Sequence, residues 1–345
     1  MEKSKPALSN WVFLRGDGSP EIGMGHIYRL LAIAEYLESN CQIGFISYNS
    51  EIESILPEYV RFFPLENNVG NIEAEFSQIK NIQGIKDSSI VVDSYTFKNE
   101  YFKKLKSLVH KLIYIDDLFI SNTSFDIVVN HSIFSKKEDY TNTNNCTYLL
   151  GTKYALLRKE YLQRMQSITA PSPQSTFKTI FICFGGSDIH SFSTKMAEIL
   201  SLMPEIKTIN IVTGVFNQKN NISESIFQNP KIKFHQGISA TKMIEVIEQS
   251  DLCISSASTI SYEICALRKP LIIGFYAENQ INLYNGLIDC KLGLGLGDLR
   301  LLSSKKIAAF LETYIKLDFE SYIENQIKYF DGRSAERISN RILSE

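Results

Sequence analysis

The sequence predicts an α/β protein with two doubly wound, Rossmann-like domains. Short apolar runs alternate with segments of helical period along most of the 345 residues, a pattern typical of parallel sheets covered by helices. A chain of that length suits about two domains. The polar segment Gln166–Thr176, with two prolines and no periodicity, is typical of a linker. We therefore expect an N-terminal domain at residues 1–165, a linker at 166–176 and a C-terminal domain at 177–345.

The first series contains short runs of β-forming residues, several of which are followed by segments of helical period. The expected strands are Trp11–Arg15, Gln42–Ser47, Ser89–Asp93, Leu112–Ile115 and Asp126–Asn130. The expected helices are His26–Glu38, the acidic stretch Asn71–Ile82, and Lys98–His110.

The second series repeats this alternation after the linker. Its expected strands are Thr179–Phe184, Thr208–Thr213, Lys231–His235, Leu252–Ser255 and Pro270–Phe275. Its expected helices are Ser191–Leu202, Ala240–Gln249, Thr259–Leu267 and Asn279–Leu287, with more helix from Ser303 onward. The last helix, around Ser334–Leu343, could pack back on the first domain. Two doubly wound halves predict a ligand site in the cleft between them, at the carboxyl ends of the strands.

The charge balance and the short apolar runs exclude several classes of protein. Lys and Arg total 36 against 38 Asp and Glu, and a net charge of -2 excludes a broadly basic nucleic-acid coat. No window of about 18 apolar residues predicts a membrane span, and the N-terminal MEKSKPALSN lacks the apolar stretch of a secretory signal. Six scattered cysteines without a Cys-x-x-Cys pair are typical of buried, reduced thiols. We expect a cytoplasmic protein with no nucleic-acid partner and no membrane anchor.

The most informative local signal is the glycine-rich segment RGDGSPEIGMGH at 15–26, which follows a strand and opens a helix. Backbone amides and the helix dipole at such a junction favour a ligand with negative charge. The segment departs from the Walker pattern, because Met24 stands where that pattern requires lysine. It departs from the dinucleotide fingerprint, because Glu21 takes the place of the third glycine. A metal site is not expected, because His26 has no second ligand at helical or loop spacing.

His26 is the candidate general base. The dipole at a helix N-terminus disfavours an imidazolium, so we expect a neutral ring that accepts a proton from water or a hydroxyl. The adjacent Gly25 and the nearby Asp17 and Arg29 favour this function, and the alternative is a histidine that caps the helix or packs in the core. The other histidines lack such a setting and are expected to be structural: His110, His131, His190 and His235.

Small and hydroxyl residues in the second half predict a nucleotide site. Gly185 and Gly186 follow its first strand and would let a ligand approach the backbone, although an ordinary tight turn explains them equally well. Hydroxyl residues from Ser255 to Thr259 run from a strand end into a helix, where free amides suit a diphosphate. The same residues could simply cap that helix.

Polar side chains further along the second half could complete this site. Glu263 lies in the first turns of the helix after the hydroxyl segment, where its carboxylate could accept hydrogen bonds from ribose hydroxyls. Asn279 and Gln280 open the next helix, where they could fix polar groups of a sugar or serve as an N-cap.

Several segments are informative as an ordered set. They are RGDGSPEIGMGHIYR at 15–29, VVDSYTF at 91–97, YIDD at 114–117, GTKYALLRKEY at 151–161, FICFGGSD at 181–188, SSASTISYEICALRKPL at 255–271 and ENQ at 278–280. This set resembles the UDP-2,4-diacetamido-2,4,6-trideoxy-β-L-altropyranose hydrolases of pseudaminic acid synthesis, relatives of the UDP-GlcNAc transferases that make peptidoglycan lipid intermediates. The resemblance covers about residues 10–290. It implies a GT-B fold, two Rossmann-like domains with a cleft between them and the nucleotide held mainly by the C-terminal one.

The resemblance also implies roles for individual residues. In that family the histidine of the Gly-x-Gly-His motif activates water, and His26 occupies that position here. The tyrosine of the Asp-x-Tyr motif and the asparagine of the Asn-Gln pair are active-site residues, which match Tyr95 and Asn279. Glu263 is expected on the ribose. The other residues expected to bind substrate are Gly25, Arg29, Gly185, Gly186, Ser256, Ser258, Thr259 and Gln280, with Ser258 and Thr259 at the phosphates.

Other positions match the motifs less decisively. Asp17 is expected in the catalytic group, although Asp17, Arg29 and Asp93 could hold the loop rather than take part in chemistry. Two features depart from the family pattern, namely Arg268 before the Lys-Pro pair and a longer tail beyond about residue 300. They leave the expected fold unchanged and leave the identity of the sugar open.

The reaction implied by the resemblance is an inverting hydrolysis. Water attacks the anomeric carbon, UDP leaves, and the free diacetamido sugar feeds a nonulosonic acid used on flagellin or other surface glycans. UDP leaves readily once a helix N-terminus meets its charge, so the chemistry requires no metal and no cofactor. The implied partners are the UDP-sugar and other enzymes of nonulosonic acid synthesis. Two alternatives stay open: a GT-B glycosyltransferase that uses a hydroxyl acceptor, and a nucleotide-sugar binding module without catalysis.

Overall fold

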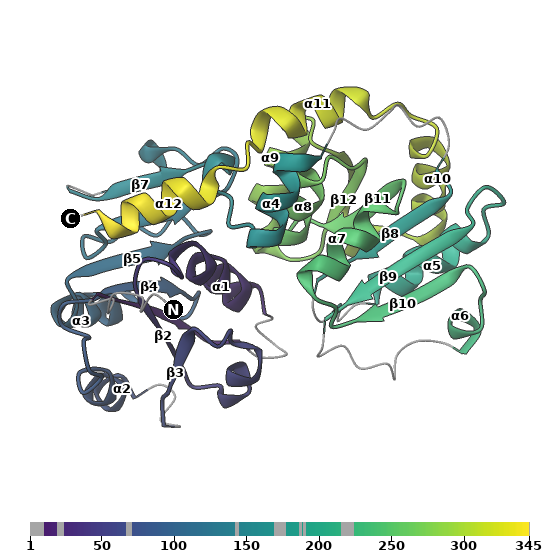
Figure 1. Cartoon of the computed structure of the whole chain (residues 1–345). Helices are drawn as coiled ribbons and strands as arrows, with labels where there is room; N and C mark the ends of the chain where they lie inside the picture. The colour runs from purple at the N-terminus through teal and green to yellow at the C-terminus, as the bar shows by residue number, and fades with distance from the viewer. Residues whose placement is uncertain are drawn as a thin grey trace, which may run out of the picture. The chain divides into compact units, whose positions relative to one another are not determined.

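Two parallel β-sheets organise the chain (Figure 1). The computed structural model describes residues 10–18, 24–66, 71–141, 145–168, 177–185, 188, 191–214 and 224–344. Unit 1 comprises Met1–Lys159 with Arg333–Glu345, and unit 2 comprises Glu160–Gly332. These boundaries differ from the expected ones, because residues 160–165 belong to unit 2 and residues 333–345 belong to unit 1. Most of the expected linker, at 169–176, lies outside the described residues.

Unit 1 is built on a seven-stranded sheet of order β3-β2-β1-β4-β5-β6-β7, with every neighbouring pair parallel. The strands are β1 Trp11–Gly16, β2 Gln42–Ser47, β3 Val60–Pro64, β4 Ser89–Asp93, β5 Lys111–Ile115, β6 Ile127–Asn130 and β7 Thr147–Leu150. The strand order reverses between β1 and β4. In doubly wound sheets, ligands bind at the carboxyl ends of the strands at such a reversal.

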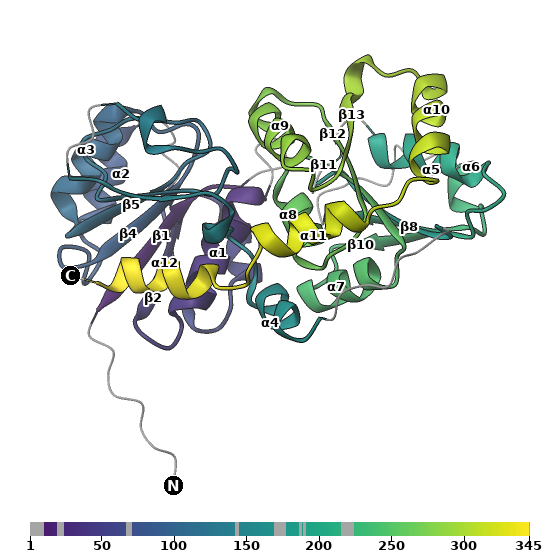
Figure 2. The same cartoon turned by 90° about the horizontal axis from the view of Figure 1, so that it is seen from above.

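Within the described part of unit 1, four helices cover the sheet, together with three short 3₁₀ helices. They are α1 Gly25–Leu37, α2 Ile72–Ile79, α3 Asn99–Leu108 and α12 Ser334–Leu343, with η1 Ser50–Ile55, η2 Lys137–Asp139 and η3 Thr152–Tyr154. Helix α1 packs on β1 and β4, and α12 packs against α1. Figure 2 shows α2 and α3 on the face of the sheet opposite to the face that α1 covers. The last helix is thus part of unit 1, where Lys111 Nζ donates a hydrogen bond of 3.2 Å to the carbonyl of Ile342.

Unit 2 repeats the design with a six-stranded parallel sheet of order β10-β9-β8-β11-β12-β13. The strands are β8 Thr179–Cys183, β9 Thr208–Thr213, β10 Ile232–Gln236, β11 Leu252–Ser256, β12 Leu271–Phe275 and β13 Leu294–Asp298. The order reverses between β8 and β11, so the second candidate ligand edge lies at the ends of these strands.

The helices of unit 2 lie on both faces of its sheet. They are α4 Lys159–Ser167, α5 Phe192–Ser201, α6 Glu224–Phe227, α7 Ala240–Glu248, α8 Thr259–Ala266, α9 Ile281–Asp289, α10 Ser304–Tyr314 and α11 Glu320–Tyr329, with η5 Glu278–Gln280 and η6 Leu299–Leu301. Helices α5 and α10 share a buried apolar core with β8, β9 and β11, while α8 packs on β11 and β12. Among the described residues, no helix combines the length and the apolar character needed to cross a bilayer.

Candidate active site

The junction between β1 and α1 places a histidine beside the end of β4. Gly16 at the end of β1 pairs with Asp93 at the end of β4. A Cβ atom at Gly16 would lie 2.5 Å from Leu30 Cδ1 of α1 and 3.3 Å from the Asp93 carbonyl oxygen, so glycine lets α1 pack this closely. His26 lies in the first turn of α1 and Arg29 follows three residues later, so both share the helix face that meets Asp93.

The carboxylate of Asp93 is the centre of a buried polar cluster. His26 Nδ1 lies 2.5 Å from Asp93 Oδ1. Arg29 donates to both oxygens of the same carboxylate, from Nη2 to Oδ1 at 2.7 Å and from Nε to Oδ2 at 2.8 Å. Asp93 is completely buried, and His26 and Arg29 are 4% and 5% exposed. The bidentate contact with Arg29 offsets the cost of burying the Asp93 charge.

The contacts of His26 define which ring nitrogen can act as a base. Nδ1 faces a carboxylate oxygen to which Arg29 also donates, so Nδ1 carries the ring proton and donates it to Asp93. Arg29 Nη2 lies 3.1 Å from the same nitrogen, but a guanidinium has only protons to offer and directs one of them to Asp93. Nε2 has no hydrogen-bond partner within the part of the chain that the structure describes. This arrangement makes Nε2 the proton acceptor, held in orientation as in other His-Asp pairs.

Tyr95 and Asp117 extend the cluster toward the surface. The Tyr95 hydroxyl donates to Asp117 Oδ2 at 2.6 Å, and Arg29 Nη1 donates to the same oxygen at 2.5 Å. The rings of Tyr95 and His26 pack edge to face with their centroids 4.4 Å apart. Tyr95 is 37% exposed, so the buried cluster reaches solvent beside the candidate base.

Burial and neighbouring charges shift the protonation of this outer part of the cluster. Burial alone would raise the pKa of Asp117, but the charge of Arg29 and the hydrogen bonds from Tyr95 and Arg29 hold that pKa well below its usual range. Partial burial and the carboxylate of Asp117 raise the pKa of Tyr95, so its hydroxyl stays protonated at neutral pH. Burial lowers the pKa of His131 to about 4 despite the nearby Asp117, and its Nδ1 accepts from the backbone N–H of Leu156 at 3.3 Å.

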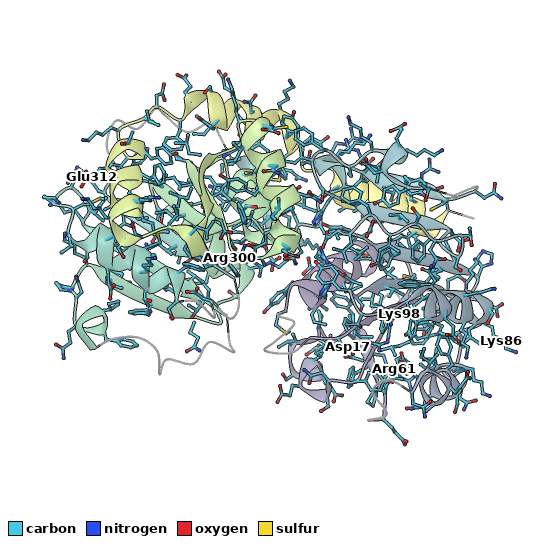
Figure 3. The ribbon with its side chains drawn as sticks, turned by 180° about the vertical axis from the view of Figure 1, so that it is seen from behind. Asp17, Arg61, Lys86, Lys98, Arg300 and Glu312 are labelled. Carbon is cyan, nitrogen blue, oxygen red and sulfur yellow. The ribbon has the colours of Figure 1, made fainter. Side chains whose placement is uncertain are left out.

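Asp17 belongs to a second polar cluster, directly after β1 (Figure 3). Its Oδ2 accepts from Arg15 Nη1 at 2.6 Å. Its Oδ1 accepts from the Ser47 hydroxyl at 2.8 Å and from the backbone N–H of Tyr48 at 3.0 Å. Both oxygens of Asp17 are therefore bound to the ends of β1 and β2. These bonds favour a structural role in which Asp17 holds the glycine-rich segment, rather than a direct role in chemistry.

Arg15 anchors this second cluster in the sheet. Its side chain is completely buried, and Nε donates to Glu75 Oε1 of α2 at 3.0 Å. The guanidinium lies 5.3 Å and 4.9 Å from the ring centroids of Tyr48 and Phe97. Glu75 also accepts from the hydroxyls of Tyr48 and Tyr101, at 2.9 Å and 2.6 Å. Packing on aromatic rings and paired carboxylates makes a buried arginine tolerable here.

In unit 2, the hydroxyl segment lies at the end of β11 and leads into α8. Ser255 and Ser256 are completely buried, and the hydroxyls of Ser256 and Ser258 lie 3.0 Å apart. Ser258 stands at the N-cap of α8 but makes no hydrogen bond from its side chain to the helix. The hydroxyl of Ser258 therefore does not satisfy the first-turn amides beginning at Thr259, and such amides attract anions. Glu263 lies in the middle of α8 and is 7% exposed.

The remaining residues expected in unit 2 lie on the loops after β8 and β12. Gly185 adopts φ +89°, which favours glycine, and a Cβ atom there would lie 3.6 Å from the Tyr276 hydroxyl. Gln280 accepts from the backbone N–H of Tyr276 at 3.0 Å, so its side chain fixes the turn after β12. Asn279 is exposed in η5. Gly186 lies outside the described residues.

The structure thus gathers the expected site residues into separate groups. His26, Arg29 and Tyr95 form one cluster with Asp93, whereas Asp17 joins the Arg15 cluster. Gly25 begins α1 at an exposed position, and a Cβ atom there would meet nothing within 4 Å, so packing does not require glycine. Ser256, Ser258, Thr259 and Glu263 belong to one strand-to-helix segment of unit 2.

No role was assigned from the sequence to several residues that complete these clusters. They are Glu75, Tyr48, Tyr101 and Asp117. His131, which was expected to be structural, lies close enough to Asp117 for their charges to interact. The second carboxylate of the YIDD segment was available as a signal for Asp117, because acidic residues at the end of a strand lie on the ligand edge of a parallel sheet. Among the other histidines, His110 is exposed, His235 Nε2 lies 3.1 Å from Asn210 Oδ1, and His190 lies outside the described residues.

Comparison with protein-family models finds none that matches the chain. Among curated proteins, an uncharacterized protein of Methanocaldococcus jannaschii is 29% identical over 279 residues, which are 78% of this chain but only 56% of that protein. The UDP-2,4-diacetamido-2,4,6-trideoxy-beta-L-altropyranose hydrolase of Campylobacter jejuni is 27% identical over 78% of this chain and 93% of that protein. The spore coat polysaccharide biosynthesis protein SpsG of Bacillus subtilis is 23% identical over 82% of this chain and 83% of that protein.

Solved structures of GT-B glycosyltransferases have the same fold. MurG of Acinetobacter baumannii superimposes with a TM-score of 0.63 at 10% identity, over 96% of this chain and 99% of that chain. The lipopolysaccharide glycosyltransferase WaaG gives a TM-score of 0.57 at 10% identity, over 97% and 100% of the two chains. The calicheamicin glycosyltransferase CalG4 gives a TM-score of 0.62 at 10% identity, over 96% of this chain and 97% of that chain. The predicted fold class of two Rossmann-like domains of GT-B type is confirmed, and the chain is related in sequence to an enzyme that acts on a UDP-sugar.

Proposed function

We propose that the protein hydrolyses a UDP-linked 2,4-diacetamido-2,4,6-trideoxyhexose at the anomeric C–O bond. The products would be UDP and the free sugar with inverted configuration, a precursor for a nonulosonic acid. The observation that carries the proposal is the buried pair in which Asp93 fixes His26 and leaves Nε2 as a proton acceptor. The similarity to the Campylobacter jejuni hydrolase over 93% of that protein supports the substrate class.

The proposed reaction begins with proton removal from water. His26 Nε2 takes a proton from the water as its oxygen attacks the anomeric carbon, and the ring becomes an imidazolium. Asp93 stabilises that imidazolium through the contact at Nδ1, and Arg29 keeps the carboxylate in place from its other side. The Tyr95 ring beside His26 would lie next to the reacting sugar. Arg29 and Asp17 act in this proposal by positioning other groups, and Tyr95 and Asn279 would contact the substrate.

The leaving UDP needs stabilisation of its developing charge. In the proposal the amides and hydroxyls at the start of α8, from Ser256 to Thr259, bind the diphosphate, and Glu263 binds the ribose. The exposed start of α1 at Gly25 also presents amides without a side-chain cap. Gly185 and Gln280 are the further residues that we propose to contact the nucleotide-sugar.

The first test measures UDP release by the purified protein from UDP-2,4-diacetamido-2,4,6-trideoxy-β-L-altropyranose without any acceptor. We expect multiple turnovers, with the label of ¹⁸O-water recovered in the sugar, because the anomeric C–O bond breaks. We expect His26→Ala to retain UDP binding and to lose at least about a hundredfold in kcat, the usual contribution of a general base.

The competing functions predict different results in the same assay. UDP release that requires an added sugar hydroxyl would identify a glycosyltransferase and contradict the proposal. UDP binding without any turnover would identify a binding module. Normal turnover by His26→Ala would show that His26 is structural and that the proposed mechanism is wrong.

A further inference from the structure

The hydroxyl proton of Tyr95 is already committed within unit 1. It is donated to Asp117 Oδ2 at 2.6 Å, and the same carboxylate oxygen accepts from Arg29 Nη1 at 2.5 Å. Because the pKa of Asp117 lies well below its usual range, Asp117 is ionised at neutral pH and has no proton to return. The oxygen of Tyr95 is therefore left with lone pairs only, and it can meet a ligand only as a hydrogen-bond acceptor.

The neighbouring His26 presents an acceptor as well. Its Nδ1 proton is committed to Asp93, so Nε2 also offers a lone pair. The two rings pack edge to face at 4.4 Å between centroids, so the two side chains border one region of unit 1. A single guanidinium fixes both acceptors, because Arg29 holds Asp93 through Nε and Nη2 and holds Asp117 through Nη1.

Two acceptors that face one bound molecule select for a molecule with two protons to donate. Water has two O–H groups and can satisfy both acceptors while a lone pair points toward the sugar, whereas an alcohol has one O–H group and leaves one acceptor unpaired. We infer that Asp117 is a positioning residue that makes Tyr95 a hydrogen-bond acceptor, so that Tyr95 and His26 together hold the nucleophilic water and disfavour an alcohol. This inference rests on the proposed function and explains why the proposed enzyme would transfer its sugar to water.

The test is a competition between two nucleophiles. Wild type and variants are incubated with UDP-2,4-diacetamido-2,4,6-trideoxy-β-L-altropyranose in buffer containing methanol, and NMR gives the ratio of methyl glycoside to free sugar. Tyr95→Phe removes one acceptor, so we expect that ratio to rise about three- to tenfold, the size expected for one hydrogen bond. Asp117→Ala should raise it similarly, because the Tyr95 hydroxyl loses the acceptor of its proton and can turn that proton toward the ligand. The ratio is set within each active molecule, so a loss of folded protein does not change it.

The double variant tests whether Asp117 acts through Tyr95. We expect Tyr95→Phe combined with Asp117→Ala to give the ratio of Tyr95→Phe alone, because Asp117 acts on the ratio only through the Tyr95 hydroxyl, which is already absent. Tyr314→Phe and Asp126→Ala are matched controls, since the Tyr314 hydroxyl donates to the Gly295 carbonyl and Asp126 pairs with Lys106, and both should keep the wild-type ratio.

Three results would overturn the inference. An unchanged ratio in Tyr95→Phe would show that Tyr95 does not hold the nucleophile. Additive changes in the double variant would show that Asp117 acts elsewhere. UDP release by wild type only in the presence of a sugar hydroxyl would overturn both this inference and the proposed function. Either of the first two results, obtained while wild type hydrolyses the substrate, would overturn this inference alone.

Discussion

At the scale of single residues, one guanidinium holds the candidate catalytic cluster together. Arg29 contacts two carboxylates that are far apart in the sequence, Asp93 at the end of β4 and Asp117 after β5. Buried charges are costly unless they are paired, so loss of either carboxylate would leave part of the Arg29 charge uncompensated. The arrangement therefore couples the position of His26 to that of Tyr95, which are the two groups proposed to face the nucleophile.

His131 gives this cluster a measurable dependence on pH. Its pKa is about 4 in the folded protein, below the ordinary value of 6.5, so the unfolded chain binds more protons between these values. The free energy of unfolding of unit 1 should therefore fall as the pH falls from 6.5 toward 4. In His131→Asn, the amide oxygen can accept from the Leu156 N–H in place of Nδ1. Between pH 7 and pH 5 we expect the free energy of unfolding of this variant to fall by about 2 kcal/mol less than that of wild type.

Urea unfolding followed by tryptophan fluorescence measures this difference, because Trp11 in β1 is the single tryptophan of the chain and reports on unit 1. His110→Asn is the matched control, since His110 is exposed, and it should retain the wild-type dependence on pH. An equal loss of stability in wild type and His131→Asn between pH 7 and pH 5 would contradict the assignment of that loss to His131.

The residues of the cluster differ in how far the sequence could predict them. His26 stands in a distinctive glycine-rich segment, and a helix that opens after a strand predicts where it lies. Glu75 lies in an ordinary segment, and the YIDD segment places Asp117 at a strand end without indicating its partner. The partners Arg15 and Arg29 are 60 and 88 residues away along the chain. Periodicity and local motifs contain no information about such pairings, which depend on the strand order of the folded sheet.

At the scale of elements, the close approach of α1 to β1 and β4 decides the geometry of the site. Gly16 allows it, and a methyl group there would overlap Leu30 of α1. We expect Gly16→Ala to lower the free energy of unfolding of unit 1 by about 1–3 kcal/mol, the usual cost of overpacking. The shift of α1 should also weaken the contact of His26 with Asp93 and lower kcat, while UDP affinity stays near the wild-type value.

Gly25→Ala is the matched control for stability, because a Cβ atom there meets nothing within 4 Å. Its unfolding free energy should equal or slightly exceed that of wild type, since alanine restricts the unfolded chain. Urea unfolding of both variants, read through Trp11, checks the pair. Equal stabilities for Gly16→Ala and Gly25→Ala would show that α1 does not depend on glycine for its packing.

The central strands of both described sheets were predicted, as was the edge strand β10 at Lys231–His235, whereas the other edge strands were missed. The predicted runs Gln42–Ser47, Ser89–Asp93 and Thr208–Thr213 are strands with those bounds. Strands β3, β7 and β13 were missed, and each lies at the edge of a sheet. Edge strands need less continuous apolar sequence, and β13 contains two glycines, one of which lies beneath the Tyr284 side chain.

At the scale of the whole molecule, the chain passes from unit 1 to unit 2 near Lys159 and returns near Arg333. The sequence placed the first crossing only a few residues later, because a polar segment with prolines follows α4. The sequence contains no comparable signal for the return of the chain to unit 1. The amphipathic pattern of α12 indicates that one face of the helix is buried, but it does not indicate which element covers that face. In the structure that face contains Ile338 and Ile342, both buried, and α12 packs against α1.

The return of the chain predicts that its last helix stabilises the first unit. Ile338→Ala truncates a completely buried side chain of α12. We therefore expect the free energy of unfolding of the transition reported by Trp11 to fall by about 2–4 kcal/mol. Ile327→Ala makes the same change on α11 of unit 2, where the side chain is 38% exposed, and it should leave that transition unchanged. A Trp11 transition that shifts equally in both variants, or in neither, would contradict the assignment of α12 to unit 1. Because α12 packs against the helix that contains His26, the proposed hydrolysis of the UDP-sugar should be lost at lower urea concentrations in Ile338→Ala than in Ile327→Ala.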